Sequence, residues 1–256
     1  MKLSVVIPAH HEEGQLVQTV TELARHLRAE QIDYEIIVVD DHSADATLAK
    51  AEQLSQTVRA VRVCSNQHPR GFGFAVRTGL AHVEGDAVAI VMADGSDDPR
   101  DVVRCYRKLL EGYDCVFGSR FIRGSRVIGY PLHKLLLNRL ANTLIQVLFG
   151  ISHNDITNAF KLYTREAIEG VQPLLSHHFN LTVELPLKAI VRGYSYATIP
   201  INWYQRKRGM SKLKIKEMGS RYLFIVLYVW LEKHLSRGDY HKRLHERQTL
   251  SNRSRR

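Results

Sequence analysis

Carboxylate side chains follow three separate apolar runs of this chain, each close to the point where the run ends. They are Glu12, Asp40, Asp41 and Asp94. If the three runs are strands of one parallel sheet, these carboxylates meet in the crevice at its carboxyl edge, where ligands of open α/β sheets bind. A single acidic loop more often caps the next helix, but three loops in register favour a shared site. Because carboxylates can hold Mg²⁺ or Mn²⁺ against phosphate oxygens, the pattern predicts a site for a metal and a nucleotide diphosphate.

The elements that must place these carboxylates follow from the hydrophobic pattern. Short β-branched runs predict strands, and apolar residues spaced three to four apart predict helices between them. Such alternation is typical of βαβ units and a parallel sheet. The expected strands cover residues 3–7, 34–39, 58–63, 87–91 and 115–118. After residue 118 the alternation stops, with helices expected at 131–149, 165–171, 181–192 and 216–235 and strands at 160–163 and 194–201.

Composition limits the classes of protein to which the chain can belong. Its 256 residues are 45% hydrophobic, enough to bury the core of one domain. The formal net charge of +10 predicts an anionic partner, such as a phosphorylated ligand, an anionic lipid surface or a nucleic acid. Cys64, Cys105 and Cys115 are odd in number and lack a CxxC spacing, which favours buried, reduced thiols and a cytoplasmic location. The first apolar run is too short for a signal peptide.

The stretch from Asp94 to Pro99 has a divided role. Asp94 and the hydroxyl of Ser96 are candidate ligands for a metal that bridges two phosphates. Asp97 and Asp98 are expected to cap the helix that begins at Pro99. No G-x-G-x-x-G follows the first strand and no P-loop occurs in the sequence, so these two nucleotide-binding motifs are excluded.

Several motifs, taken in order along the chain, resemble the family 2 glycosyltransferases of the GT-A fold. The subgroup they resemble most is that of the polyprenyl-phosphate sugar transferases, typified by dolichyl-phosphate mannose synthase. The motifs are Val5-Val6-Ile7-Pro8-Ala9 with Glu12-Glu13, the segment 37–45, Asp94 with Pro99, Gly118-Ser119-Arg120-Phe121, and the segment 203–212 with Arg206, Gly209, Ser211 and Lys212. The resemblance covers roughly residues 3–235.

This resemblance implies a fold and a division of the chain. The fold is a single α/β domain of GT-A type, Rossmann-like, with a mostly parallel central sheet flanked by helices and an added C-terminal helix. We expect the catalytic domain at 1–212, an apolar helix at 213–235 that lies on a membrane surface or on the core, and a disordered basic tail at 236–256. The apolar run within that helix is about half as long as a membrane-spanning helix needs, so no transmembrane segment is expected.

The resemblance also implies roles for individual residues. Those that would hold the nucleotide-sugar are Pro8, Ala9, Glu12, Asp40, Asp41, Asp94 and Arg206. The catalytic residues would be Asp94, Asp155, Arg206 and Lys212, the acceptor phosphate would bind Arg120 and Lys134, and the metal would bind Asp94 and Ser96. The family pattern is D-A-D with Gln two residues later, whereas this chain has Met92 for the first Asp and Ser96 for the Gln. An Asx turn is the open alternative for Asp155, and a solvated helix face is expected for Arg139.

The activity implied is transfer of a hexose of mannose or glucose type, with inversion, from a nucleotide-diphosphate sugar to a polyprenyl phosphate, either dolichyl or undecaprenyl. The expected cofactor is Mg²⁺ or Mn²⁺, and the expected location is the cytoplasmic face of a membrane, with a membrane protein as a further partner. One alternative is a soluble or polysaccharide acceptor. Another is a catalytically weak subunit that binds nucleotide-sugars, suggested by Met92. Nucleic acid is not an expected partner, since no base-stacking platform is recognisable.

Overall fold

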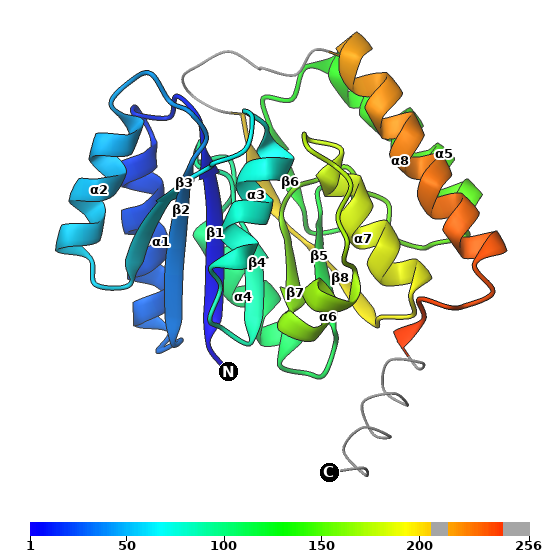
Figure 1. Ribbon diagram of the computed structural model, residues 1–256, viewed down its shortest axis with the longest axis horizontal. Coiled ribbons are helices and arrows are strands. Elements are labelled where there is room, and N and C mark those ends of the chain that lie inside the picture. The colour runs from blue at the N-terminus through cyan, green and yellow to red at the C-terminus, as the bar shows by residue number, and fades with distance from the viewer. Residues whose placement is uncertain (206–214, 243–256) are drawn as a thin grey trace.

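A seven-stranded sheet forms the centre of the protein (Figure 1), whose computed structural model describes residues 1–205 and 215–242. Its strand order is β3-β2-β1-β4-β7-β5-β8, and β7 alone runs antiparallel to its neighbours. The strands are β1 (Leu3–Ala9), β2 (Tyr34–Asp40), β3 (Val61–Ser65), β4 (Ala87–Ile90), β5 (Cys115–Ser119), β7 (Lys161–Thr164) and β8 (Tyr196–Pro200). The expectation of a mostly parallel α/β domain is confirmed.

Helices cover both faces of this sheet because successive strand residues point to opposite sides. Val5 and Ile7 of β1 pack with α1 and α4, whereas Val6 packs with α3. The helices are α1 (Leu16–Ala29), α2 (Thr47–Thr57), α3 (Phe72–Ala81), α4 (Pro99–Leu109), α5 (Leu132–Phe149), α6 (Arg165–Gly170), α7 (Leu181–Val191) and α8 (Ile215–Leu235). A third apolar cluster joins α5, α7 and α8, and Figure 1 shows α5 and α8 together beyond α7.

Three features differ from the sequence-based expectations. The third strand begins at Val61 instead of residue 58, because the Val58 N–H still bonds to Leu54 and ends α2. A small parallel sheet of β6 (Arg126–Ile128) and β9 (Asn202–Tyr204) lies where a loop was expected. The start of the predicted disordered tail packs on the domain, since the Lys242 ammonium lies 2.8 Å from the Asp114 carboxylate.

Two further sequence-based expectations concern the cysteines and the membrane. Cys105 and Cys115 are buried and Cys64 is half-buried, and all three are free thiols. Within the described ranges, no helix has the length and apolar character needed to cross a bilayer. The C-terminal helix α8 uses Ile225 and Val229 to pack on α7, so one of its faces belongs to the core.

Candidate active site

The ends of β1, β2 and β4 lie side by side at the carboxyl edge of the sheet. The register pairs Ala9 with Asp40 and Asp40 with Ser65, while Val6 pairs with Ile90 of β4. Pro8 and Ala9 are buried in β1, and the Ala9 carbonyl accepts a hydrogen bond of 2.8 Å from the Asp41 N–H. The carboxylate-bearing loops predicted from the sequence therefore converge on one edge.

One of the two carboxylate oxygens of Asp40 accepts no hydrogen bond from the described residues. The side chain is only 5% exposed, and its Oδ2 accepts a hydrogen bond of 3.3 Å from the Ser43 N–H. Its Oδ1 is buried and has no hydrogen-bond partner among the residues that the structure describes. Buried polar atoms are almost always satisfied, so Oδ1 is suited to a donor supplied by a ligand. An imide N–H of a base and a ribose hydroxyl both meet that requirement.

The protein itself supplies hydrogen-bond donors to both carboxylate oxygens of Asp41. Its Oδ1 accepts from the Asn66 side chain at 2.7 Å, and both carboxylate oxygens accept from the Gly71 N–H at 3.0 and 3.2 Å. A Cβ at Gly71 would lie 2.4 Å from the His177 carbonyl oxygen, so this turn requires glycine. The helix-entry turn expected at Gly71 is present, and Asp41 fixes it near the carboxyl end of β2. The contact of Asp41 with a nucleoside stays a prediction.

Glu12 lies in the loop after β1, where its backbone N–H donates to the Thr47 hydroxyl at 2.8 Å. This bond ties the loop to the start of α2, next to the loop that follows β2. The Glu12 side chain is half-buried. Its role in holding the nucleoside stays a prediction; β1, which precedes this loop, ends at Ala9 opposite Asp40.

Asp94 and its neighbours form a compact acidic turn after β4. Asp94 is buried, and its Oδ1 accepts a hydrogen bond of 3.1 Å from the Ser96 N–H. Asp98 caps α4 as expected, accepting from the Arg100 N–H at 3.0 Å. Asp97 does not cap that helix; instead it accepts from the Met92 N–H at 2.9 Å and closes the turn. Burial, together with the charge of Asp94, raises the pKa of Asp97 to about 7.

This turn supplies few protein ligands for a metal. Among residues 1–205 and 215–242, no group of three or more His, Cys, Asp or Glu side chains is arranged to hold a metal ion. The Asp94 carboxylate and the Ser96 hydroxyl are hard oxygen donors that suit Mg²⁺ or Mn²⁺, and phosphate oxygens and water would complete the shell. A cation at this position would also relieve the repulsion between Asp94 and Asp97, so the donor set fits a metal shared with a diphosphate.

Arg120 and Asp155 form a buried ion pair at the end of β5. The Arg120 backbone N–H and Nε donate to Asp155 Oδ2 at 2.9 and 2.8 Å, and Nη2 donates to Oδ1 at 2.7 Å. Burial alone would raise the pKa of Asp155, but the charge and hydrogen bonds of Arg120 lower it. Asp155 is therefore an anionic partner of Arg120, and its carboxylate is 0% exposed.

Aromatic side chains surround the Arg120 guanidinium. Its carbon lies 5.2 Å from the ring centre of Phe121, 5.5 Å from that of Tyr130 and 6.0 Å from that of Trp203. These distances permit cation–π attraction. No hydrogen bond involves Arg120 Nη1 in the described part of the chain, so this edge of the guanidinium has donors for an anion.

The helix α5 places two further cations beside this pair. Lys134 is half-buried and forms no ion pair within the described ranges. Arg139 differs from the expected solvated face, because its Nη1 donates to the Asn154 carbonyl at 2.9 Å and its guanidinium lies 4.6 Å from the Phe121 ring centre. Lys134 thus remains a candidate for the acceptor phosphate, whereas Arg139 holds the loop before Asp155.

Arg206 and Lys212 lie outside the described residues, but the strand that leads to them does not. The Tyr204 N–H of β9 donates to the Ser96 carbonyl at 3.1 Å, and Trp203 forms a bridge with Asp97. The Gln205 N–H donates to the Ile128 carbonyl at 2.9 Å. Strand β9 therefore contacts the acidic turn on one side and β6, its partner in the small sheet, on the other. The sequence did not predict the contact with the acidic turn.

Known proteins are similar to this chain over most of its length. The model of the Glycosyl transferase family 2 matches residues 4–171. The polyprenol monophosphomannose synthase of Mycolicibacterium smegmatis is 32% identical over 215 residues, which cover 82% of this chain and 80% of that protein. The dolichol-phosphate mannosyltransferase of Pyrococcus furiosus is 29% identical, and the match covers 84% of this chain but 60% of that longer protein.

Solved structures share the fold. Glucosyl-3-phosphoglycerate synthase from Mycobacterium tuberculosis, in complex with Mn²⁺, uridine-diphosphate and glucosyl-3-phosphoglycerate, superposes with a TM-score of 0.67 at 21% identity. The match covers 91% of this chain and 79% of that one. The same enzyme with Mn²⁺ and uridine-diphosphate-glucose also gives a TM-score of 0.67, at 20% identity. At this identity the likeness establishes the α/β fold alone.

Proposed function

Because the chain belongs to glycosyl transferase family 2 and is a glycosyltransferase, we propose that it transfers a hexose from a nucleotide-diphosphate sugar to a polyprenyl phosphate at a membrane surface. The sugar is of mannose or glucose type, and the mannose assignment has the support of the two relatives' names. The single observation that carries the proposal is the pair of sites at one sheet edge. Asp40 and Asp94 offer acceptors for the donor nucleotide, and Arg120 offers guanidinium donors for an acceptor anion.

The reaction needs little acid–base chemistry from the protein. An anionic oxygen of the acceptor phosphate attacks the anomeric carbon, a carbon–oxygen bond forms there, and the bond to the diphosphate breaks on the opposite face with inversion. Because the nucleophile is already anionic, the chain's residues contribute mainly by positioning both substrates. Arg120 and Lys134 orient the acceptor phosphate, and Arg206 and Lys212 neutralise the leaving diphosphate. A bound Mg²⁺ or Mn²⁺ would supply further charge stabilisation at Asp94.

An exposed apolar stripe on α5 supports a lipid acceptor. Its members repeat at three- or four-residue intervals and so share one helix face, and each residue is 62% to 77% exposed. They are Leu132, Leu136, Leu140, Leu144 and Val147. The neighbouring α8 exposes a second set, Leu223, Phe224, Leu227, Leu231 and Leu235. Contiguous exposed apolar surface of this kind is typical of protein or membrane contacts.

Three cations follow Arg120 in the chain, up to the first turn of α5. Arg123 is exposed in the loop after β5, Arg126 is the exposed first residue of β6, and Lys134 lies in the first turn of α5. Within the described ranges none of the three forms a salt bridge. A membrane surface rich in anionic lipid attracts such residues while the apolar side chains enter the interface. This arrangement would bring the acceptor's phosphate to Arg120 while its isoprenoid chain stays in the bilayer.

The acceptor and the membrane contact can be tested in parallel. When the protein is assayed with each acceptor in turn, we expect it to transfer labelled hexose to polyprenyl phosphate but not to 3-phosphoglycerate. The second compound represents the alternative class of soluble acceptors. For the membrane contact, Leu136→Ser with Leu140→Ser should reduce co-sedimentation with anionic vesicles, because burying one leucine contributes about 1.5–3 kcal/mol. Leu110→Ser is the matched control, since Leu110 is also exposed but lies at the end of α4. Equal vesicle binding by all variants would contradict the proposed surface.

A further inference from the structure

Lys161 is a fully buried cation at the carboxyl edge of the sheet, and no carboxylate forms an ion pair with it in the described part of the chain. It is the first residue of β7, and the strand register places it between Ile90 of β4 and Phe117 of β5. Only 1% of the residue is exposed. Its ammonium donates to three backbone carbonyls. They are that of Asn158, that of Ile156 at 2.9 Å and that of Thr182 at 3.3 Å.

Burial of this ammonium is costly. Transfer of an ion from water to a protein interior carries a large free-energy penalty even after relaxation, and a protein with an apolar residue of similar volume in its place is often at least as stable. The cost is visible in the pKa of Lys161, which burial lowers to about 7 although the charge of Asp155 opposes the shift. A stabilising role is therefore a weak explanation for a lysine at this position. The three carbonyls that it contacts indicate a positional role instead.

Two of those carbonyls belong to the loop that carries Asp155. Ile156 and Asn158 flank Thr157, whose N–H donates to the side chain of Asn142 on α5 at 3.2 Å. The Asn158 side chain donates to the Gly118 carbonyl of β5 at 3.2 Å. This loop, residues 155–158, thus lies between the end of β5 and α5. The two residues assigned to the acceptor phosphate are close by in the chain, since Arg120 directly follows β5 and Lys134 lies on α5.

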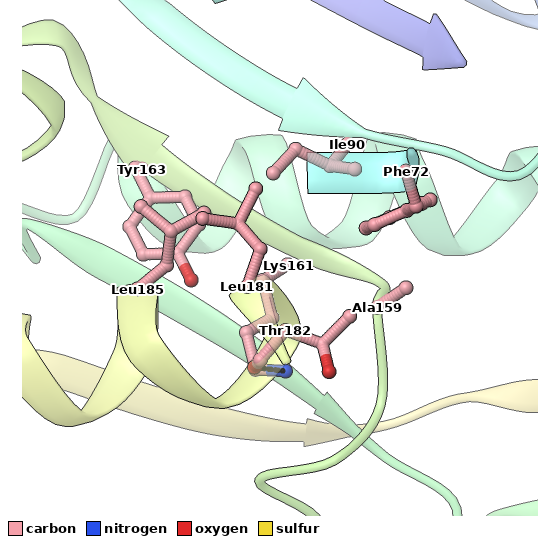
Figure 2. Close-up of a pocket in the computed structure, with 8 residues that line it drawn as sticks. All are labelled: Phe72, Ile90, Ala159, Lys161, Tyr163, Leu181, Thr182 and Leu185. Carbon is pink, nitrogen blue, oxygen red and sulfur yellow. Dashed lines mark hydrogen bonds between the residues drawn. The ribbon is translucent and has the colours of Figure 1, made fainter. Parts of the chain in front are cut away.

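The third carbonyl belongs to a different element. Thr182 lies in the first turn of α7, and its carbonyl contact with Lys161 ties the 155–158 loop to that helix. Figure 2 shows the Lys161 ammonium beside Thr182, in a pocket that is also lined by Phe72 of α3, Tyr163 of β7 and Leu185 of α7. Lys161 is thus the point where the loop, the sheet and α7 meet.

We propose that Lys161 is a positioning residue for the acceptor site: by holding the 155–158 loop, it sets Asp155 and hence the orientation of the Arg120 guanidinium. This inference rests on the proposed function, because it assigns the consequence to the acceptor phosphate. Lys161 itself touches neither substrate. Loss of its ammonium frees the loop from α7, so Arg120 loses its fixed direction. Donor binding at Asp40 and Asp94 depends on other loops and is unaffected.

The test compares Lys161→Met, Lys161→Arg and Tyr163→Phe in the full-length protein. Methionine fills a similar volume without donors, whereas arginine restores donors for the carbonyls. Tyr163→Phe is the matched control, since Tyr163 is buried on the same strand and lines the same pocket. Steady-state transfer of labelled hexose to polyprenyl phosphate gives the KM of the acceptor and the KM of the donor separately. Circular dichroism verifies that each variant is folded.

We expect the acceptor KM of Lys161→Met to rise tenfold or more, since misplacement of a positioning group by about 1 Å can cost on the order of a hundredfold. The donor KM should stay within about twofold, Lys161→Arg should recover most of the loss, and Tyr163→Phe should match the wild type. An unchanged acceptor KM in folded Lys161→Met would overturn the inference and leave the proposed function standing. Absence of any transfer by the wild-type protein would overturn the proposed function, and the inference with it.

Discussion

Replacing Asp155 distinguishes two roles for its carboxylate, as the buried partner of Arg120 and as a group that acts on the transferred sugar. Asp155→Ala removes an acceptor of three hydrogen bonds from Arg120 and leaves a guanidinium that is 7% exposed without its counter-charge. Removal of one member of a buried ion pair costs about 3–5 kcal/mol. We therefore expect the free energy of unfolding, measured with urea, to fall by about that amount, and the acceptor KM to rise.

A double variant sharpens this prediction. Arg120→Met combined with Asp155→Leu removes both charges, and apolar replacement of a whole buried pair is often neutral or stabilising. The double variant should regain most of the lost free energy of unfolding, but its acceptor KM should stay high because the guanidinium is gone. Wild-type stability in Asp155→Ala, accompanied by loss of turnover at saturating acceptor, would exclude the role as partner of Arg120 and assign Asp155 to the sugar.

The pH dependence of the same pair follows from the pKa of Asp155. Arg120 lowers this pKa below the ordinary value of 3.8 in the folded state, so the unfolded chain binds the proton more readily. The pair's contribution to stability is therefore complete well above pH 3.8 and is lost as the pH falls below it. Urea unfolding of the wild type and Asp155→Ala should give free energies that converge in acid. A constant difference down to the lowest accessible pH would contradict the ion pair.

Three further predictions concern single groups. Asp94→Ala should abolish metal-dependent turnover while Met92→Ala retains it; full metal-dependent activity in Asp94→Ala would remove Asp94 from the metal site. Asp40→Ala should weaken nucleotide-sugar binding by about tenfold or more in calorimetry, since a hydrogen bond to a charged group contributes about 1.5–3 kcal/mol; an equal Kd would exclude the contact. Because burial lowers the pKa of Lys161 from 10.5 to about 7, the unfolded chain binds this proton more tightly between those values. The wild type should therefore gain up to about 1.4 kcal/mol per pH unit over Lys161→Met as the pH rises in that window, and a flat difference in urea unfolding would contradict the shift.

The strand ends were predictable because each combines a short apolar run with an abrupt change to polar residues. Asp40 and Asp94 stand directly at such changes, so sequence alone placed them at one sheet edge. The convergence of β1, β2 and β4 needed only the rule that parallel strands of βαβ units end on the same side. Asp98 was also predictable as a helix cap, because Pro99 follows it.

The remaining features depend on contacts between residues that are distant in the sequence. Arg120 and Asp155 are 35 positions apart, and no local pattern indicates that they pair. Strands β6 and β9 have three residues each, too few for a periodic signal, and each exists only through the other. Asp97 was expected at the helix cap, but the turn after β4 directs its carboxylate back to Met92. Lys161 begins the short strand β7, and nothing in the sequence around it indicates that its ammonium contacts three backbone carbonyls.

The most direct test of the central claim is transfer of a labelled hexose to a lipid phosphate embedded in vesicles. Purified protein is incubated with Mg²⁺ or Mn²⁺, a panel of labelled nucleotide-diphosphate hexoses and vesicles that contain polyprenyl phosphate. We expect one labelled glycolipid, with the anomeric configuration inverted relative to the donor. No lipid-linked label with any donor, while calorimetry still detects nucleotide binding, would contradict it.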